Sequence, residues 1–424
     1  MQKIKFIHAA DLHIESPYRG VSNLNPELGE RLIQLGFKAF DNLIEACIVH
    51  EIDFLLIAGD SFDSENASLS AQFRFLRGLQ KLTAQNIPVY IVCGNHDPLS
   101  SWIKEINLPE HVHVFQGNEV QQAEVLKEGK TLVHIYGVSF EDKVENRSLA
   151  EQFRAEDKSV FSIGLLHGTF AGIQHKNPYC PMTLDQLKRS GMHYWALGHI
   201  HKREVVHELK PTVIYPGNLQ GRHFNETGKK GAYVVEVDDK NTITPTFISL
   251  SEVVFLREEI MLTEDESLPS LSDKIEGLKG RCIDEFGSVL LRLTLKGNTP
   301  LYEELRDARQ LNTFADTLNE GVNYQADFAF ISRIENKTQP LINWEERKQG
   351  DDFVADLIRK YEAIQADDTT QQEIIQSILE EIDSSQVYRK LRKYDLDANF
   401  SLEALIDLAK TRSITALIAD KRDH

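Results

Sequence analysis

The chain has 424 residues and a formal net charge of −18, since its 65 acidic side chains outnumber its 47 lysines and arginines. This length favours two or three domains, and an apolar content of 41% supplies ordinary buried cores, which excludes a largely disordered chain. The acidic balance also excludes nucleic-acid binding through bulk charge. To bind a nucleic acid, the protein would need metal ions, a local basic patch or a partner to offset the repulsion of the phosphates.

The first 250 residues are predicted to form a layered α/β domain. Three buried strands alternate with two helices, at 3–9, 28–50, 53–58, 68–84 and 89–92. This alternation implies crossover connections and a parallel core. Further short strands and one helix follow, at 132–138, 160–166, 183–191 (the helix), 194–197, 212–215 and 231–237. They predict two packed β-sheets with helices outside them.

Two smaller regions are expected after this domain. Residues 251–340 are predicted to form a small α+β unit, with strands at 253–262, 288–296 and 324–334 and helices at 270–283 and 300–319. Residues 341–424 are predicted to be helical, at 351–364, 370–383, 386–394 and 401–419. This last segment is short for an independent core, so we expect its apolar faces to pack on the rest of the chain or on another chain.

The cysteines and the N-terminus indicate where the protein works. The four cysteines are far apart and include no CxxC pair: Cys47, Cys93, Cys180 and Cys282. This spacing argues against a disulfide framework and fits a reducing cytoplasm. No apolar run reaches the roughly 18 residues that a membrane helix needs, and the charged N-terminus is unlike a signal peptide. We therefore expect a cytoplasmic protein with no membrane partner.

Five short motifs stand at or just after predicted strand ends. In chain order they are Asp11-Leu12-His13, Gly59-Asp60-Ser61-Phe62-Asp63, Gly94-Asn95-His96-Asp97, His167-Gly168 and Gly198-His199-Ile200-His201. Each is weak alone, because Asp-x-His occurs by chance and Gly-Asp is often a turn. Together they mix carboxylate, amide and imidazole groups, which suit hard or borderline divalent ions, and they lack the thiolates of a structural zinc site. Seven ligands exceed the needs of one ion and predict two ions sharing a bridging carboxylate.

The order of these motifs resembles the signature of the calcineurin-like metallophosphoesterase superfamily, D-x-H, G-D-x-x-D, G-N-H-D/E, H and G-H-x-H. The resemblance covers about residues 1–250. The opening FIHAADLHIESPY and the run from ALGHIHKREVV to IYPGNLQGRHFNE are similar to the bacterial SbcD-like DNA exonucleases, and more narrowly to the YhaO-type proteins. This resemblance implies a four-layer sandwich, a capping domain at 251–340, and a docking segment for an SbcC-like ATPase at 341–424.

The resemblance also implies a role for each motif residue. One metal ion would be held by Asp11, His13, Asp60 and His201, and the other by Asp60, Asn95, His167 and His199, so that Asp60 bridges. Members of the family commonly use Mn²⁺, and the ligand types permit that ion without singling it out over Fe or Zn. His96 is implied to face the scissile phosphate instead of binding metal, where it can act as a general acid.

Four further residues are candidates for supporting roles. Asp63 and Asp97 complete their motifs, and we expect each to orient a ligating histidine. Arg222 and His223 follow a glycine-containing turn just beyond the last motif. Arg222 would either grip a phosphate or pair with a nearby carboxylate such as Glu226, and the sequence leaves both readings open.

The resulting hypothesis is a metal-dependent nuclease that cuts DNA as the nuclease subunit of an SbcCD-like repair complex. One alternative is a phosphatase or cyclic-nucleotide phosphodiesterase, which would need neither a capping unit nor docking helices. Another is a non-catalytic scaffold that binds DNA ends, which the intact ligand set argues against. The sequence leaves open the native metal, exonuclease or endonuclease action, and the oligomeric state, including a homodimer.

Overall fold

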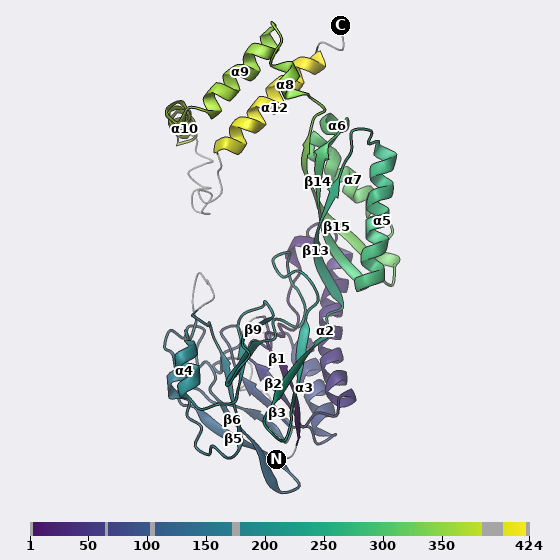
Figure 1. The fold of residues 1–424 in the computed structure, drawn as a ribbon. Coiled ribbons are helices and arrows are strands. Elements are labelled where there is room, and N and C mark those ends of the chain that lie inside the picture. Colours follow the sequence, from purple (N-terminus) through teal and green to yellow (C-terminus); the bar gives the residue numbers. More distant parts are fainter. Residues whose placement is uncertain (1–2, 64–66, 102–106, 172–178, 384–401, 421–424) are drawn as a thin grey trace. The chain divides into compact units, whose positions relative to one another are not determined.

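The computed structural model describes residues 3–63, 67–101, 107–171, 179–383 and 402–420 (Figure 1). Contacts within the chain divide it into two compact units. The first comprises Met1–Glu258, Gly277–Arg292 and Asp316–Arg333, and the second Glu259–Glu276, Leu293–Ala315 and Ile334–His424. Among the described residues, no helix has both the length and the apolar character needed to cross a membrane.

The first sheet has six strands. From edge to edge they are β12 (Ile243–Ser249), β11 (Gly231–Val237), β1 (Ile4–Ala9), β2 (Phe54–Ala58), β3 (Val89–Val92) and β4 (Val112–Val114). The strands β1, β2, β3 and β4 run parallel, as the crossover connections predict, while β11 pairs antiparallel with both β1 and β12. Nearly every side chain of β1, β2 and β3 is buried, because both faces of these strands are covered.

Two helices cover the outer face of this sheet (Figure 1). They are α2 (Pro26–Val49), which follows the short α1 (Arg19–Ser22), and α3 (Leu69–Thr83). The side chain of Asn25 caps α2 by accepting a hydrogen bond from the Leu28 amide at 3.0 Å, and Pro26 occupies the first turn. Ser68 caps α3 in the same way. Apolar residues of both helices pack on the sheet, among them Phe40, Leu43, Phe75 and Leu79.

The second sheet packs on the other face of the first. Its strands are, in order, β5 (Gln121–Lys127), β6 (Lys130–Gly137), β7 (Phe161–His167), β8 (Tyr194–Gly198), β10 (Thr212–Tyr215) and β9 (Glu204–His207). A shared apolar core joins the two sheets, with Phe6 and Phe54 from one and Ile163 and Tyr194 from the other. A second cluster covers the far side with η2 (Leu149–Gln152) and α4 (Leu184–Arg189). The predicted pair of packed sheets flanked by helices is confirmed.

Four strands, β4, β5, β9 and β12, are missing from the sequence prediction. All four are edge strands of their sheets, and Val125 is the one buried side chain among them. Such polar segments lack the continuous apolar run of a buried strand, and pairing with a neighbour is what stabilises them.

A three-stranded sheet and its helices follow the two large sheets. The sheet has the order β13 (Val253–Met261), β14 (Ser288–Asn298) and β15 (Ala329–Gln339). The helices are α5 (Leu268–Phe286), α6 (Tyr302–Arg306), α7 (Ala308–Leu318) and the 3₁₀ turn η3 (Val322–Tyr324). The predicted strand at 324–334 therefore begins later, and the predicted helix at 300–319 is broken at Asp307. The contact-based division passes through this sheet, so the domain boundaries near 250 and 340 stay a prediction.

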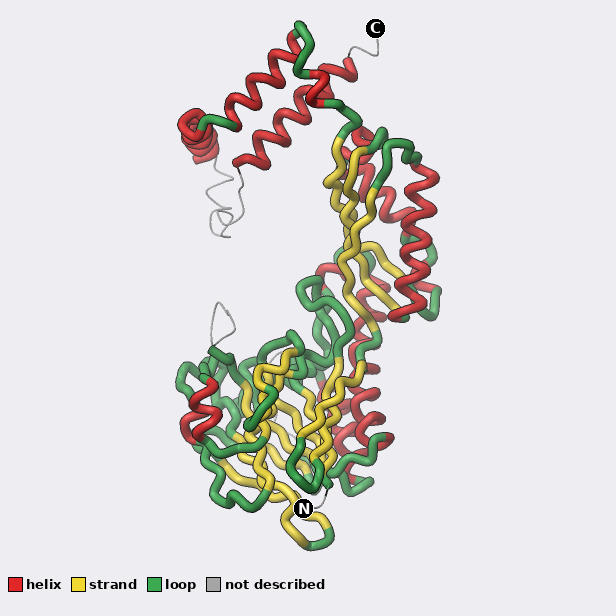
Figure 2. Tube along the Cα trace, viewed as in Figure 1, coloured by secondary structure: helices red, strands yellow, loops and turns green. Residues whose placement is uncertain are grey.

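The described elements in the last part of the chain are helices, as predicted, and Figure 2 draws them in red. They are α8 (Trp344–Arg347), α9 (Phe353–Gln365), α10 (Asp368–Asp383) and α12 (Leu402–Asp420). Val354 and Ile358 of α9 pack against Ile414 of α12 in a small apolar cluster. The helix predicted at 386–394 lies outside the described residues.

Candidate metal centre

The five motifs meet where strands of the two sheets end. Asp11, His13, Asp60 and Asn95 follow β1, β2 and β3, which are neighbours in the first sheet. His167 is the last residue of β7, and His199 and His201 follow its neighbour β8 in the second sheet. Because parallel strands present their carboxyl ends at one edge, the packed sheets bring these seven side chains into one place.

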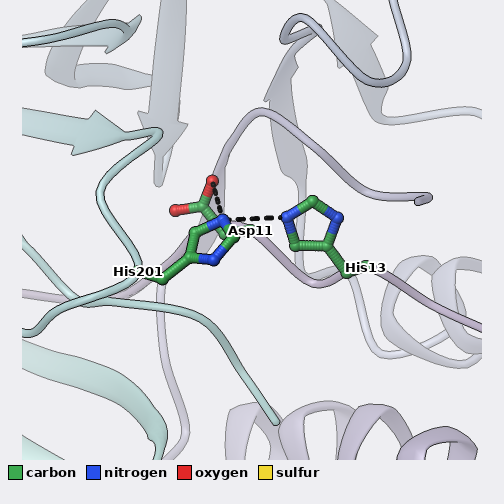
Figure 3. A group of neighbouring side chains, drawn as sticks. All are labelled: Asp11, His13 and His201. Carbon is green, nitrogen blue, oxygen red and sulfur yellow. Dashed lines mark hydrogen bonds and ion pairs between the residues drawn. The ribbon is translucent and has the colours of Figure 1, made fainter. Parts of the chain in front are cut away.

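A first group of candidate ligands consists of Asp11, His13 and His201, which point toward one another in Figure 3. The Nε2 atoms of His13 and His201 are 3.0 Å apart. The Nε2 atom of His201 lies 4.0 Å from Oδ1 of Asp11. One ion among these three atoms would be within reach of all of them.

A second group lies beside the first. Nε2 of His167 is 3.4 Å from Oδ2 of Asp60 and 3.1 Å from Oδ1 of Asn95. The same Asn95 oxygen lies 3.1 Å from Nδ1 of His199. Oδ2 of Asp60 also lies 3.8 Å from Nε2 of His13, so this carboxylate reaches both groups. That position is the one a bridging ligand requires.

The hydrogen bonds of the imidazole rings show that the groups fit divalent cations. Nδ1 of His201 lies 2.6 Å from a Glu226 oxygen, and Nδ1 of His13 lies 3.3 Å from an Asp63 oxygen. A carboxylate can only accept, so Nδ1 of His201 carries the proton in the neutral ring and leaves a lone pair on Nε2, which faces Nε2 of His13 at 3.0 Å. Nδ1 of His167 donates to the Ala58 carbonyl at 2.9 Å, so its Nε2 lone pair likewise faces the Asn95 oxygen. A divalent cation among these groups would give their acceptor atoms a common partner.

Burial and charge set the protonation of these groups. Burial lowers the pKa of His13 to about 3, which keeps this ring neutral and ready to bind a metal ion. Burial raises the pKa of Asp11 to about 6, although the charges of the nearby His201 and His167 work to lower it. Burial alone would lower the pKa of His167, but the charges of Asp60 and Asp11 outweigh it and raise that pKa to about 9. A proton and a metal ion therefore compete for His167 near neutral pH.

The backbone at the site is strained. Asp11, His13, Asp60 and His199 have φ angles of 49°, 42°, 50° and 99°, a region that residues with a side chain rarely occupy. Such strain persists only where the surrounding fold enforces it, and it gathers at functional sites. The motif glycines also permit close approach, since a Cβ on Gly94 would lie 2.3 Å from an Asp60 oxygen.

His96 lies next to the candidate ligands and is held by two hydrogen bonds. Its backbone amide donates to Oδ1 of Asp60 at 2.9 Å, and its Nδ1 donates to the carbonyl of Asp63 at 2.9 Å. Its ring packs edge-on against that of His13, with 5.0 Å between the centroids. These contacts fix the ring and leave Nε2 as the nitrogen that a substrate would meet.

The two flanking carboxylates have different contacts. Asp63 lies beside His13, with its Oδ1 atom 3.3 Å from Nδ1 of the ring, and its role in orienting that histidine stays a prediction. Asp97 instead accepts hydrogen bonds from the backbone amides of Asp60, Ser61 and Gly94, at 3.1, 2.7 and 3.0 Å. The expectation that Asp97 orients a histidine stays a prediction. Asp97 ties the loop after β2 to the loop after β3, and no described histidine forms a hydrogen bond with it.

Glu226 is the carboxylate that orients His201, and sequence reasoning considered it only as a partner of Arg222. Its buried side chain accepts hydrogen bonds from Nδ1 of His201, from the backbone amide of Arg222 at 2.8 Å and from Nδ2 of Asn218 at 2.9 Å. Burial works to raise its pKa, but His201 and Arg222 hold that pKa well below the usual range of a glutamate. The only signal in the sequence was its position in the loop after the last motif.

Arg222 and His223 both reach the same carboxylate cluster. The Arg222 guanidinium pairs with Asp63 and lies 3.7 Å from Glu226, so in this structure Arg222 contacts carboxylates. Nη2 of Arg222 also lies 3.3 Å from Nδ1 of His201, which places a fixed positive charge beside a candidate ligand. His223 is more exposed, and its Nε2 lies 3.3 Å from Glu226. Phosphate binding by either side chain stays a prediction.

Comparison with known proteins shows similarity to metal-dependent phosphoesterases, in agreement with the candidate metal centre. Residues 4–203 match the sequence profile of the calcineurin-like phosphoesterases. The chain is 36% identical to the metallophosphoesterase YhaO of Bacillus subtilis over 340 residues, which are 80% of this chain and 83% of YhaO. It is 26% identical over 325 residues to the DNA double-strand break repair protein Mre11 of Methanocaldococcus jannaschii, covering 72% of this chain and 81% of that protein. Both alignments are longer than the matched profile, so the similarity continues past residue 203.

Proposed function

Since this chain belongs to the calcineurin-like metallophosphoesterase family, we propose that it is a metal-dependent nuclease that hydrolyses the phosphodiester bonds of DNA. The observation that carries the proposal is the joining of two ligand groups through Asp60, with His96 hydrogen-bonded to the same carboxylate. DNA as the substrate is supported by the similarity to Mre11, a DNA double-strand break repair protein, over 72% of the chain.

The residues of the site suit this reaction. Two divalent ions, for which we propose Mn²⁺, would supply a nucleophile derived from water and positive charge on the phosphate oxygens. Because its Nδ1–H is committed to the Asp63 carbonyl, His96 would donate from Nε2 as an imidazolium, giving that proton to the departing ribose oxygen and keeping the one on Nδ1. Asp63 thus positions His96 through its backbone and His13 through its side chain. Arg222, held close to His201, would stabilise charge on a non-bridging oxygen.

A single assay separates this proposal from its alternatives. The purified chain, supplied with Mn²⁺, would be offered a small phosphodiester, a linear duplex and a hairpin DNA, with His96→Ala as the control for contaminating nucleases. Cleavage of both DNAs by the wild type alone would support the nuclease. Hydrolysis of the small ester alone would favour a phosphatase or cyclic-nucleotide phosphodiesterase. Retention of DNA ends without turnover would favour a scaffold.

We also propose that an SbcC-like ATPase docks on residues 341–424. The described helices of this segment leave large apolar side chains exposed, namely Phe353 at 68%, Leu405 at 37% and Leu408 at 43%. Leu405 and Leu408 stand three positions apart on α12, so they share a helix face that another chain would cover. A chain ending near residue 340 should hydrolyse the small ester at an unchanged rate but fail to co-purify with the ATPase. A truncated chain that aggregates would show that these helices complete the enzyme's own core.

A further inference from the structure

Three arginines lie close together beside the loop that carries Arg222. They are Arg257 of β13, Arg292 of β14 and Arg333 of β15, from the three strands of one sheet. Arg257 and Arg333 are exposed and Arg292 is half-buried. Within the described residues, no carboxylate forms an ion pair with any of them. Burial lowers the pKa of Arg292, and the guanidinium charges of Arg257 and Arg333 lower it further.

This cluster is unusual for the chain that contains it. The protein carries a net charge of −18, so an exposed arginine would more often find a carboxylate. Three guanidinium groups held together repel one another, and an anion that binds among them relieves that repulsion. Nε of Arg292 is also buried without a hydrogen-bond partner, which leaves a donor available to an acceptor. Arginine is the side chain best suited to grip phosphate oxygens with paired N–H groups.

Phe224 connects the cluster to the candidate metal centre. The guanidinium of Arg292 lies over the Phe224 ring, 4.2 Å from its centroid. Nε of Arg257 donates to the Phe224 carbonyl at 3.0 Å, and Nη2 of Arg257 donates to Oδ1 of Asn225 at 3.0 Å. Phe224 is two residues after Arg222, which contacts Asp63. Two residues of extended chain span at most about 7 Å, so the Cα atom of Phe224 lies within that distance of the Cα atom of Arg222.

The spacing indicates what kind of ligand touches both places. One strand of DNA presents a phosphate about every 3.4 Å along its axis, so the cluster lies within a few phosphates of the metal centre. A small phosphodiester held at the metal centre would not extend that far, whereas a polynucleotide would. We infer that Arg257, Arg292 and Arg333 bind the sugar–phosphate backbone of a DNA strand whose scissile bond lies at the metal centre. This inference rests on the proposed nuclease function and adds to it a binding surface for the substrate away from the reacting bond.

The inference is tested with two variants of the full chain and a matched control. Arg333→Gln and Arg292→Gln each remove one charge, and Arg281→Gln removes one from an exposed arginine of α5. Arg257 is kept, since it also holds the Phe224 loop. The readouts are hydrolysis of a small phosphodiester, KM for a duplex oligonucleotide, and the slope of log affinity against log salt concentration.

Arg333→Gln and Arg292→Gln should leave the small-ester rate unchanged and raise the oligonucleotide KM roughly tenfold. Each should reduce the salt slope by about 0.9, the value for one lost phosphate contact. Arg292→Lys should restore the slope, because the positive charge returns. Arg292 packs on the ring of Phe224, so Arg292→Gln also removes a packing contact. No described side chain forms a hydrogen bond or ion pair with Arg333, so the result with Arg333→Gln decides the test if the two variants differ.

Two outcomes would overturn the inference, and they are distinguishable. If the wild type binds and cuts DNA but Arg333→Gln behaves like Arg281→Gln, the cluster does not contact the substrate and the nuclease proposal stands. If the wild type hydrolyses the small ester but neither binds nor cuts the oligonucleotide, the proposed function fails and the inference fails with it.

Discussion

Replacing Glu226 with glutamine would test how strongly one buried carboxylate supports the metal centre. Glu226 is 6% exposed and accepts hydrogen bonds from Nδ1 of His201, the Arg222 amide and the Asn218 side chain. The charge of Glu226 makes the Nε2 lone pair of His201 more basic and holds the ring in the tautomer that can bind a metal ion. Glutamine preserves the shape of the side chain and removes that charge.

The contacts of Glu226 give the size of the effect. A hydrogen bond to a charged group contributes about 1.5–3 kcal/mol, and a neutral one about 0.5–1.5 kcal/mol. At 2.6 Å the His201–Glu226 contact is short, so we expect Glu226→Gln to lose about 1.5 kcal/mol at this bond. That loss corresponds to roughly a tenfold weaker Mn²⁺ affinity, since about 1.4 kcal/mol is a factor of ten.

The assay is calorimetric titration of metal-free protein with Mn²⁺, alongside the rate with a small phosphodiester. The matched control is Glu252→Gln, because Glu252 pairs with Lys38 and Asn42 and contacts none of the candidate ligands. Near-ultraviolet circular dichroism would establish that both variants keep the native fold. Equal Mn²⁺ affinity in Glu226→Gln and Glu252→Gln would refute the reasoning and reduce Glu226 to a structural residue.

Three further predictions concern the candidate ligands and their neighbour. His96→Ala should keep both metal ions and lose about 10²–10⁴-fold in turnover, and a loss of metal content in the same preparation would make His96 a ligand instead. Asp60→Ala should lose more metal than Asn95→Ala when the stoichiometry of each is measured, and equal losses would count against a bridging Asp60. The raised pKa of His167, about 9 against an ordinary 6.5, predicts that its protonated ring stabilises the metal-free fold fully below pH 6.5. This stabilisation is lost as pH rises through 9, while Mn²⁺ affinity increases over the same window. Between pH 6.5 and pH 9, the melting temperature of chelator-treated protein should therefore fall and the Mn²⁺ affinity measured by titration should rise.

Much of the fold could be predicted because its central elements are encoded locally. The strands β1, β2 and β3 are continuous apolar runs, and α2 and α3 show apolar positions at helical spacing. The edge strands β4, β5, β9 and β12 could not be predicted, since their half-exposed residues carry no such run and only the neighbouring strand stabilises them. The break at Asp307 was missed because the residues on both sides of it favour helix.

The sequence by itself determined the chemistry of the candidate site. Each motif follows a buried strand, so its order along the chain, its ligand types and its position at a strand end are all local properties. Only the tertiary structure decided the partners of these groups, because they come from segments far apart in the chain. Arg222 meets Asp63, which lies 159 positions earlier, and Asp97 holds the amides of Asp60 and Ser61 from the neighbouring loop. Glu226 became the support of His201 because the loop after β10 folds back over the end of β8, a path that no spacing in the sequence reveals.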